Sequence, residues 1–276
     1  MAYTAPLPYF SNSLVGTPQV GADVDITQID ATQKFALGTR FRRQDGNEYA
    51  YGYSSAGAAV GKLMASTFAS ASLTLSSNNC IAPTSAIAVA GDTVKPGAVG
   101  SKYVEITLAS VIANQFAGGY LTVGSGTGLG QTFRIRGNTA TNNPATGNVR
   151  IEFYEKITVA LDATSDVLIT GNPFADVIVK DGTNYVTAGV SVSTTTTTKP
   201  YGWFLTKGIT GCLQDDTTLA LAVGKGVAPS ASVAGAVVSV GNAATDYLTL
   251  RGLQVIGECV AVTGATSYAQ VRFFGL

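Results

Sequence analysis

The sequence contains no histidine, and only 12% of its residues carry a charge. Imidazole serves as general base, proton shuttle or metal ligand in most hydrolytic and metal chemistry near neutral pH. Without it, no serine or cysteine nucleophile has its usual base, and a zinc site would depend on scattered carboxylates. We therefore expect no catalytic residue, no metal and no cofactor, and interpret the chain as a binding or structural protein and not an enzyme.

Charges of both signs are scarce and evenly balanced, with 17 basic and 17 acidic residues. A net charge of zero provides no overall field that would attract nucleic acid or an anionic membrane, so we expect neither as a partner. A surface with so few charges is typical of a protein packed against copies of itself or against another protein. We therefore expect a homo-oligomer, with a trimer as the favoured state.

Cysteine is also rare, occurring only at Cys80, Cys212 and Cys259. These residues form no C-x-x-C motif and no even-numbered disulfide framework, so we interpret them as free, buried thiols in a reducing cytosol. Residues 1–10 lack the basic and apolar regions of a signal peptide, and no window approaches about 18 uninterrupted apolar residues. We expect cytosolic synthesis and no transmembrane helix.

The residues that are abundant favour β-structure. The chain has 32 glycines, a hydrophobic fraction of 46% and many small or β-branched residues, a mixture that suits strands joined by tight turns. Short alternating stretches recur from about residue 101, which predicts an all-β fold with a β-barrel or β-sandwich body. Only residues 111–117 suggest a helix, and they are too few to organise a fold. The predicted strands are 103–108, 119–123, 131–136, 149–154, 166–170, 176–180, 185–186, 190–192, 201–205, 218–223, 236–240, 247–250, 255–262 and 268–274.

Residues 1–33 are predicted to form an extended N-terminal arm. Pro6, Pro8 and Pro18 oppose a helix, and the apolar residues follow no helical period. An extended arm cannot build a core of its own, so we expect it to lie either on the body of its own chain or on a neighbour. Its candidate partner-contact residues are Tyr9, Phe10, Leu14 and Val15.

A β-hairpin is predicted to follow the arm, because Asp45-Gly46 is a tight-turn signal between alternating flanks. Basic residues interleaved with aromatics occur in nucleic-acid sites, but nothing elsewhere in the chain extends this positive patch. We therefore favour a protein-contact face. The second strand places Tyr49, Tyr51 and Tyr53 on one face, and the candidate contact residues on the first are Arg40, Arg42 and Arg43.

The predicted domain organisation has two parts. Residues 1–60 form the arm and hairpin, and residues 61–276 form the β-rich body, as one or two subdomains. The Ala/Ser-rich stretch 54–72 is the expected linker between arm and body, as a turn or a short helix weakened by Gly57 and Gly61.

Three further features are interpreted as structural. The glycine-rich segment 124–130 precedes a predicted strand where phosphate-binding motifs need a helix, so we expect a hairpin loop. The aspartates lack the spacing of a calcium loop and are expected in turns. Trp203, the only tryptophan, lies in an apolar strand and is expected in the core. The aspartates concerned are Asp162, Asp166, Asp215 and Asp216.

One succession of segments resembles a known group of proteins. The segments are FALGT (35–39), DGNEYAY (45–51), GKL (61–63), ANQFAGGYL (113–121), QTFRIRGN (131–138), YGWFLTKG (201–208) and VAGAV (233–237). Together they resemble the capsid decoration, or cement, proteins on the heads of tailed bacteriophages. The resemblance implies an all-β body, often trimeric, that sits on the assembled shell and joins neighbouring major capsid subunits. It brings no catalytic residues.

We therefore expect a virion structural protein that is made in the host cytoplasm and located on the capsid surface. It would bind the major capsid protein and copies of itself, and stabilise the shell by adhesion alone. A head fibre, tail or baseplate protein of the same kind of particle is one alternative. A carbohydrate-binding or carbohydrate-cleaving β protein is another, because paired carboxylates meet only in space and cannot be read from spacing.

Overall fold

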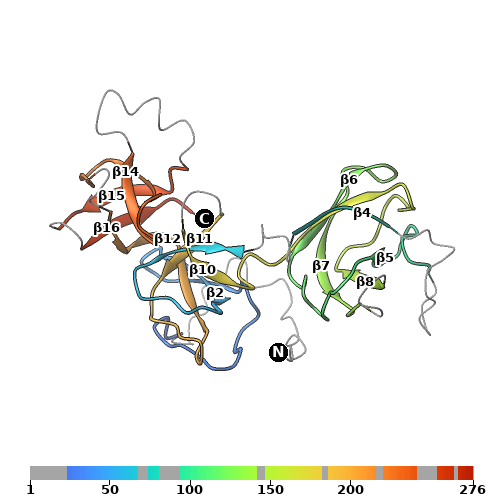
Figure 1. Cartoon of the computed structure of the whole chain (residues 1–276), viewed down its shortest axis with the longest axis horizontal. Helices are drawn as coiled ribbons and strands as arrows, with labels where there is room; N and C mark the ends of the chain where they lie inside the picture. Colours follow the sequence, from blue (N-terminus) through green and yellow to red (C-terminus); the bar gives the residue numbers. More distant parts are fainter. Residues whose placement is uncertain are drawn as a thin grey trace. The chain divides into compact units, whose positions relative to one another are not determined.

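The computed structural model describes residues 24–67, 74–80, 94–141, 147–181, 186–215, 220–240, 254–263 and 267–275, with the backbone alone for 74–79. Across these ranges it contains sixteen strands and no helix, so the all-β prediction is confirmed. Figure 1 shows the strands, which form one ten-stranded and one six-stranded sheet. Residues 111–117, for which the sequence suggests a short helix, instead form turns, in which Asn114 adopts a positive φ of 61°.

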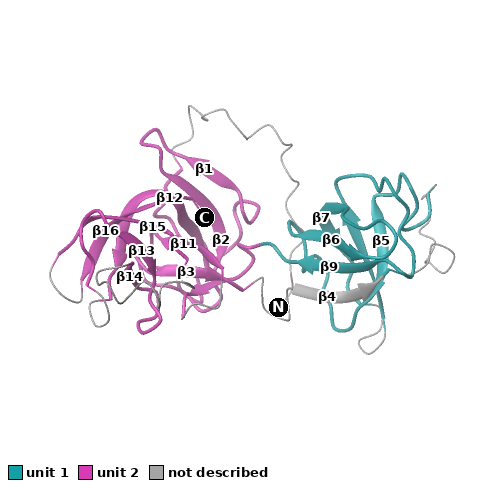
Figure 2. Cartoon of the chain, turned by 90° about the horizontal axis from the view of Figure 1, so that it is seen from above, with its two compact units in different colours: residues 1–6, 68–172 teal, residues 7–67, 173–276 magenta. Residues whose placement is uncertain are grey.

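The chain folds into two compact units, shown in different colours in Figure 2. Of the described residues, the first unit contains those within 74–172, and the second contains 24–67 and those within 173–275. The first unit is therefore an insertion within the second. The predicted division at residue 60 differs from this arrangement, because residues on both sides of it belong to the second unit.

The insertion begins and ends at neighbouring strands of the second unit. Strand β3 (Leu63–Ser66) pairs antiparallel with β10 (Val177–Val179), and the Thr67 N–H donates to the Asp176 carbonyl at 3.1 Å. The chain thus leaves and re-enters the second unit at one place. Such an arrangement allows an inserted domain to fold around its own core without breaking the host sheet.

The first unit is an antiparallel barrel. The Cys80–Ile106 bridge connects the end of β4 to β5, which are the first and last strands of the sheet, and so closes it. Alternate side chains point inward, and Phe133 stacks on Phe153 with ring centroids 4.6 Å apart. In sheet order the strands are β4 (Thr74–Asn79), β9 (Asp166–Thr170), β6 (Tyr120–Ser125), β7 (Thr132–Asn138), β8 (Asn148–Phe153) and β5 (Tyr103–Thr107).

The second unit depends on one long strand, β12 (Tyr201–Leu213). Its first half pairs with β2 (Glu48–Tyr53) on one side and β11 (Thr187–Ser191) on the other. Its second half, from Gly208 onward, pairs with β16 (Tyr268–Phe273). The remaining strands are β1 (Arg40–Arg42), β13 (Gly226–Pro229), β14 (Val237–Val240) and β15 (Gly257–Ala261).

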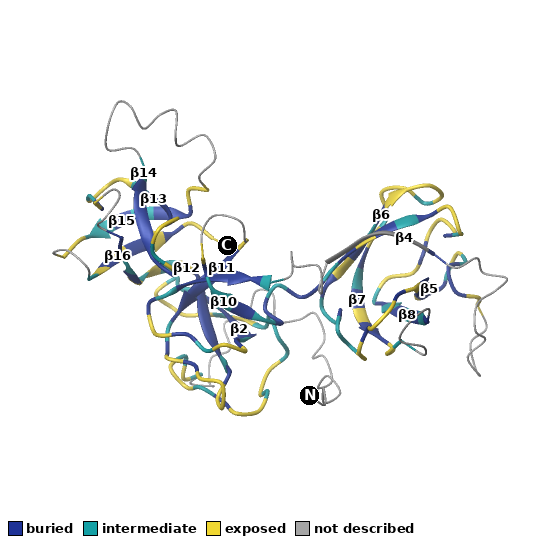
Figure 3. Cartoon of the chain, in the orientation of Figure 1, coloured by how far each residue is buried: buried dark blue, intermediate teal, exposed yellow. Residues whose placement is uncertain are grey.

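Strand β3 replaces the linker predicted for residues 54–72. All four of its residues are buried, with Leu63 in one hydrophobic cluster and Met64 in another. Figure 3 shows how fully the neighbouring β11 is buried. A strand that is covered on both faces does not alternate between apolar and polar residues, so it lacks the period-two pattern. Small residues such as Ala65 and Ser66 make the strand still harder to recognise in the sequence. Residues 68–72 lie outside the described ranges.

The predicted strand at 218–223 is also absent from the described residues 220–223. The Lys225 N–H donates to the Ala222 carbonyl at 3.1 Å, and Gly224 adopts a φ of 77°, so residues 222–225 form a turn. Within residues 220–223, Leu221 packs in the main hydrophobic cluster of the second unit. The predicted strand at 247–250 lies outside the described residues.

The described part of the predicted arm lies on the body of its own chain. Val24 and Ile26 pack against the main cluster of the second unit. Asp30 and Tyr201 exchange backbone hydrogen bonds of 2.9 and 3.2 Å. The Tyr51 hydroxyl donates to the Asp30 carboxylate at 3.3 Å. Residues 24–37, which we call the strap, therefore belong to the fold of the second unit.

Removing residues 24–33 of the strap should destabilise the second unit. A chain that begins at residue 34 should lose about 3 kcal/mol of unfolding free energy relative to one that begins at residue 24. Half-buried Val24 and Ile26 contribute about 1 kcal/mol each and the hydrogen bonds of Asp30 about 1 kcal/mol more. Urea titration of both truncated chains measures the difference, and equal midpoints would show that the strap adds no stability.

Tyr51 should make the fold sensitive to alkali. Burial raises the pKa of the Tyr51 hydroxyl well above its usual value of 10.0. As the pH rises through about 10, the unfolded chain ionises this group while the folded chain does not, so folding free energy is lost. Tyr51→Phe should be less stable at pH 8 but lose stability less steeply between about pH 9.5 and 11. Parallel slopes for both proteins in denaturant titrations would contradict this expectation.

Candidate interaction surface

The predicted hairpin is confirmed as β1 and β2. The Arg43 N–H donates to the Asn47 carbonyl at 2.9 Å, and Gly46 adopts a φ of 87°, which a residue without Cβ takes without strain. The Asp45 carboxylate accepts from the Asn47 N–H at 2.9 Å. The Asp45-Gly46 signal therefore identified the turn correctly.

The two strands of the hairpin differ in burial, with β2 largely buried and β1 largely exposed. Tyr49 and Tyr51 belong to the main cluster of the second unit, and the Tyr51 ring lies 5.2 Å from that of Trp203. Trp203 is 3% exposed, which confirms its predicted place in the core. The three arginines are exposed, with Arg40 opposite Ala50 and Arg42 opposite Glu48.

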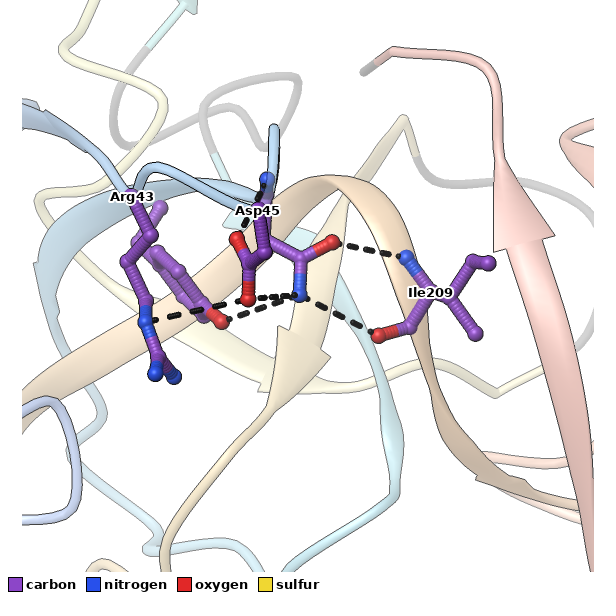
Figure 4. Close-up of polar contacts among 5 residues, drawn as sticks. Arg43, Asp45 and Ile209 are labelled. Carbon is purple, nitrogen blue, oxygen red and sulfur yellow. Dashed lines mark hydrogen bonds and ion pairs between the residues drawn. The ribbon is translucent and has the colours of Figure 1, made fainter.

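The side chain of Asn47 ties the hairpin to β12. Backbone pairing between β2 and β12 ends at Glu48 and Lys207, and the Asn47 amide continues it. Its Oδ1 accepts from the Ile209 N–H at 2.9 Å, and its Nδ2 donates to the Ile209 carbonyl at 3.4 Å (Figure 4). Gly208, between these partners, has a φ of 115°, and a Cβ there would overlap Asn47 Oδ1.

The hairpin arginines lie near two further basic residues that sequence analysis did not select. Lys207 is 3.9 Å from Glu48, and Arg272 of β16 is 3.7 Å from Glu258. The hairpin's own ion pairs are Arg42–Glu48 at 3.9 Å and Arg43–Asp45 at 3.8 Å. Exposed pairs at such distances are weak, on the order of 0–1 kcal/mol each.

Two exposed apolar side chains accompany these charges. Ile209 is 43% exposed and lies opposite Arg272 in the β12–β16 ladder. Phe274 is 57% exposed and follows Phe273, the partner of Gly208, so the register brings it beside Lys207. Lys207 Cδ lies 3.9 Å from the Cβ position of Gly275, consistent with this register. We call Lys207, Ile209, Arg272 and Phe274 the β12–β16 face.

The four predicted contact residues of the arm, Tyr9, Phe10, Leu14 and Val15, lie outside the described residues. The β12–β16 face was missed because the predicted strand ended at Leu205. The available signal was the period-two spacing of Arg272 and Phe274, which are two apart and on the same face of a predicted strand.

The other sequence features have structural roles. The glycine-rich segment is the β6–β7 hairpin loop, as predicted. Asp162 accepts from the Thr164 N–H and hydroxyl, and these bonds lower the pKa of its carboxyl. Asp215 is buried and accepts from the Ser230 hydroxyl at 2.6 Å, unlike an exposed turn carboxylate. Asp216 lies outside the described residues.

The three cysteines are free and buried, as predicted. Burial raises the pKa of the Cys80 and Cys212 thiols to about 12, which keeps them protonated near neutral pH. Within the described ranges, no group of three or more His, Cys, Asp or Glu side chains gathers as metal ligands would. The same ranges contain no helix with the length and hydropathy needed to cross a membrane.

Comparison with known proteins gives no match to any family model, curated protein or solved structure. The resemblance to phage decoration proteins therefore stays a hypothesis from the sequence.

Gly208 should be essential for the attachment of the hairpin to β12. Gly208→Ala should cost about 2 kcal/mol or more, because the added Cβ combines backbone strain with overlap on Asn47. Gly211→Ala is the matched control in the same strand, since nothing lies within 4 Å of its Cβ position. Thermal unfolding compares the two variants, and equal losses would show that Asn47 does not constrain position 208.

Proposed function

We propose that this chain is a structural protein of a bacteriophage head that binds the outer surface of the assembled shell and bridges its major capsid subunits. The observation that carries the proposal is the presence of two β-units in one chain, each with its own core. One hydrophobic cluster lies wholly within the inserted unit, and two lie wholly within the host unit. Two bodies on one chain can bind two sites.

Bridging by two bodies explains how a protein without a catalytic role could attach strongly to a particle. Once one body is bound, the second binds as an intramolecular event at an effective concentration of up to about the millimolar range. Two weak contacts then give a strong attachment. Self-association into a trimer would multiply the number of contacts again.

Binding to the closed shell alone would stabilise it by mass action. At a free concentration of about 100 times Kd, each occupied site adds roughly 2.7 kcal/mol to the assembled state. The same binding mode would serve a head fibre, tail or baseplate protein. Trp203 and Tyr51 are both buried and cannot serve the carbohydrate alternative, for which the exposed rings of Tyr120 and Tyr268 are the candidates.

Co-sedimentation of the full-length chain with heads that lack it tests the proposal directly. We expect saturable binding, and full heads that retain their DNA at higher temperature and under osmotic shock when the chain is bound. Heads that bind the chain but gain no resistance would favour a fibre or a purely decorative role. If the full-length chain does not bind heads, the proposal is wrong.

Excising the inserted unit should separate binding from bridging. A linker of about six Gly and Ser residues can join Thr67 to Pro173, because β3 and β10 are paired neighbours and Phe174 stays in the host core. The excised chain should fold and still bind heads, but about 100-fold more weakly. It should also give no protection against heat. Full affinity and full protection in the excised chain would show that the inserted unit plays no part in bridging.

A further inference from the structure

We propose that the β12–β16 face and the hairpin arginines form a docking site for an acidic protein segment that also carries apolar side chains. The inference deepens the proposed function, since the coat of the phage head would supply that segment. It commits to a protein partner and not to a nucleic acid or a lipid surface.

The arrangement of side chains favours a partner of mixed chemistry. Lys207 and Ile209 are two apart on β12, and Arg272 and Phe274 are two apart on the adjacent β16. Because Ile209 lies opposite Arg272, each exposed apolar residue neighbours a cation across the ladder. An extended segment with carboxylates and apolar residues in alternation would match both kinds of position.

The local balance of charges favours a partner of negative charge. Four cations share three carboxylates here: Arg42, Arg43, Lys207 and Arg272 against Asp45, Glu48 and Glu258. Arg40, two residues before Arg42 on β1, adds a further exposed cation. The internal ion pairs are exposed and 3.7–3.9 Å long, so they hold the cations weakly. A partner's carboxylate can replace them with shorter, bidentate bonds to arginine.

The same residues disfavour other anions. The three interleaved carboxylates would repel a continuous phosphate backbone, which needs an unbroken row of cations. The exposed side chains of Ile209 and Phe274 gain nothing from contact with phosphate, but a protein partner can bury their apolar surface, which favours binding. A protein segment satisfies both observations.

The site is already formed in the free chain. The Asn47 amide holds the hairpin on Ile209, and Gly208 permits that contact. Figure 4 shows Arg43 and Asp45 on the hairpin side of this contact and Ile209 on the strand side. Binding therefore needs little ordering of the backbone, which favours affinity.

The test compares variants of the full-length chain against two probes. Arg272→Glu with Phe274→Ser alters the proposed site, and Lys199→Glu with Val223→Ser is the control at exposed positions elsewhere in the second unit. One probe is phage heads that lack the chain. The other is a synthetic peptide repeating Glu-Ser-Leu-Ser, with a Lys-Ser-Leu-Ser peptide for comparison.

We expect the site variant to bind heads and the acidic peptide about tenfold more weakly or worse, while the control binds as the unaltered chain does. The lysine peptide should not bind. If the acidic peptide binds as expected but heads do not, the proposed function fails and the docking site stands.

Three results would overturn the inference. The first is equal binding of the site variant and the control to whichever probe the unaltered chain binds. The second is the absence of binding to both probes. The third is displacement of the peptide by double-stranded DNA or by vesicles of phosphatidylserine and phosphatidylcholine at similar concentrations.

Discussion

The second unit depends on the pairing of one strand, β12, with different partners along its length. Tyr201–Lys207 lie in a sheet with β2 and β11, while Gly208–Leu213 pair with β16. The change of partner occurs at Gly208, whose positive φ gives room for the Asn47 side chain to finish the first ladder. Trp203, before this transition, is buried, while Lys207 and Ile209, on either side of Gly208, are exposed. The same strand therefore contributes side chains both to the core and to the candidate surface.

The insertion of the barrel between β3 and β10 gives the chain a second body without interrupting that strand. Because the two connections lie at paired neighbours, the host sheet keeps its register across the insertion. The strap adds to the host unit through the bridge between Asp30 and Tyr201. The host unit thus buries Tyr49, Tyr51, Trp203 and Phe273 and leaves a small basic and apolar surface on β12 and β16.

Period-two alternation predicted those strands that have one buried and one exposed face. Strand β8 alternates buried and half-buried residues from Asn148 to Phe153, and β16 alternates from Tyr268, so both were found. Strand β3 was missed because both of its faces are buried. The insertion could not be predicted, since the pairing of residues 63–66 with 177–179 is a long-range contact that leaves no local pattern. The arginines of the hairpin were found from their clustering, but Lys207 and Ile209 were not, because nothing in the sequence shows β12 continuing past Leu205.

The central claim is that both bodies of one chain bind the same particle. Hydrogen–deuterium exchange of the full-length chain, free and bound to heads, tests it most directly because it reports each strand separately. The account predicts slower exchange on binding in both units, including Lys207–Leu213 and Tyr268–Phe273 of the host unit and at least one segment of the barrel. Protection confined to one unit, with the other exchanging as in the free chain, would contradict it.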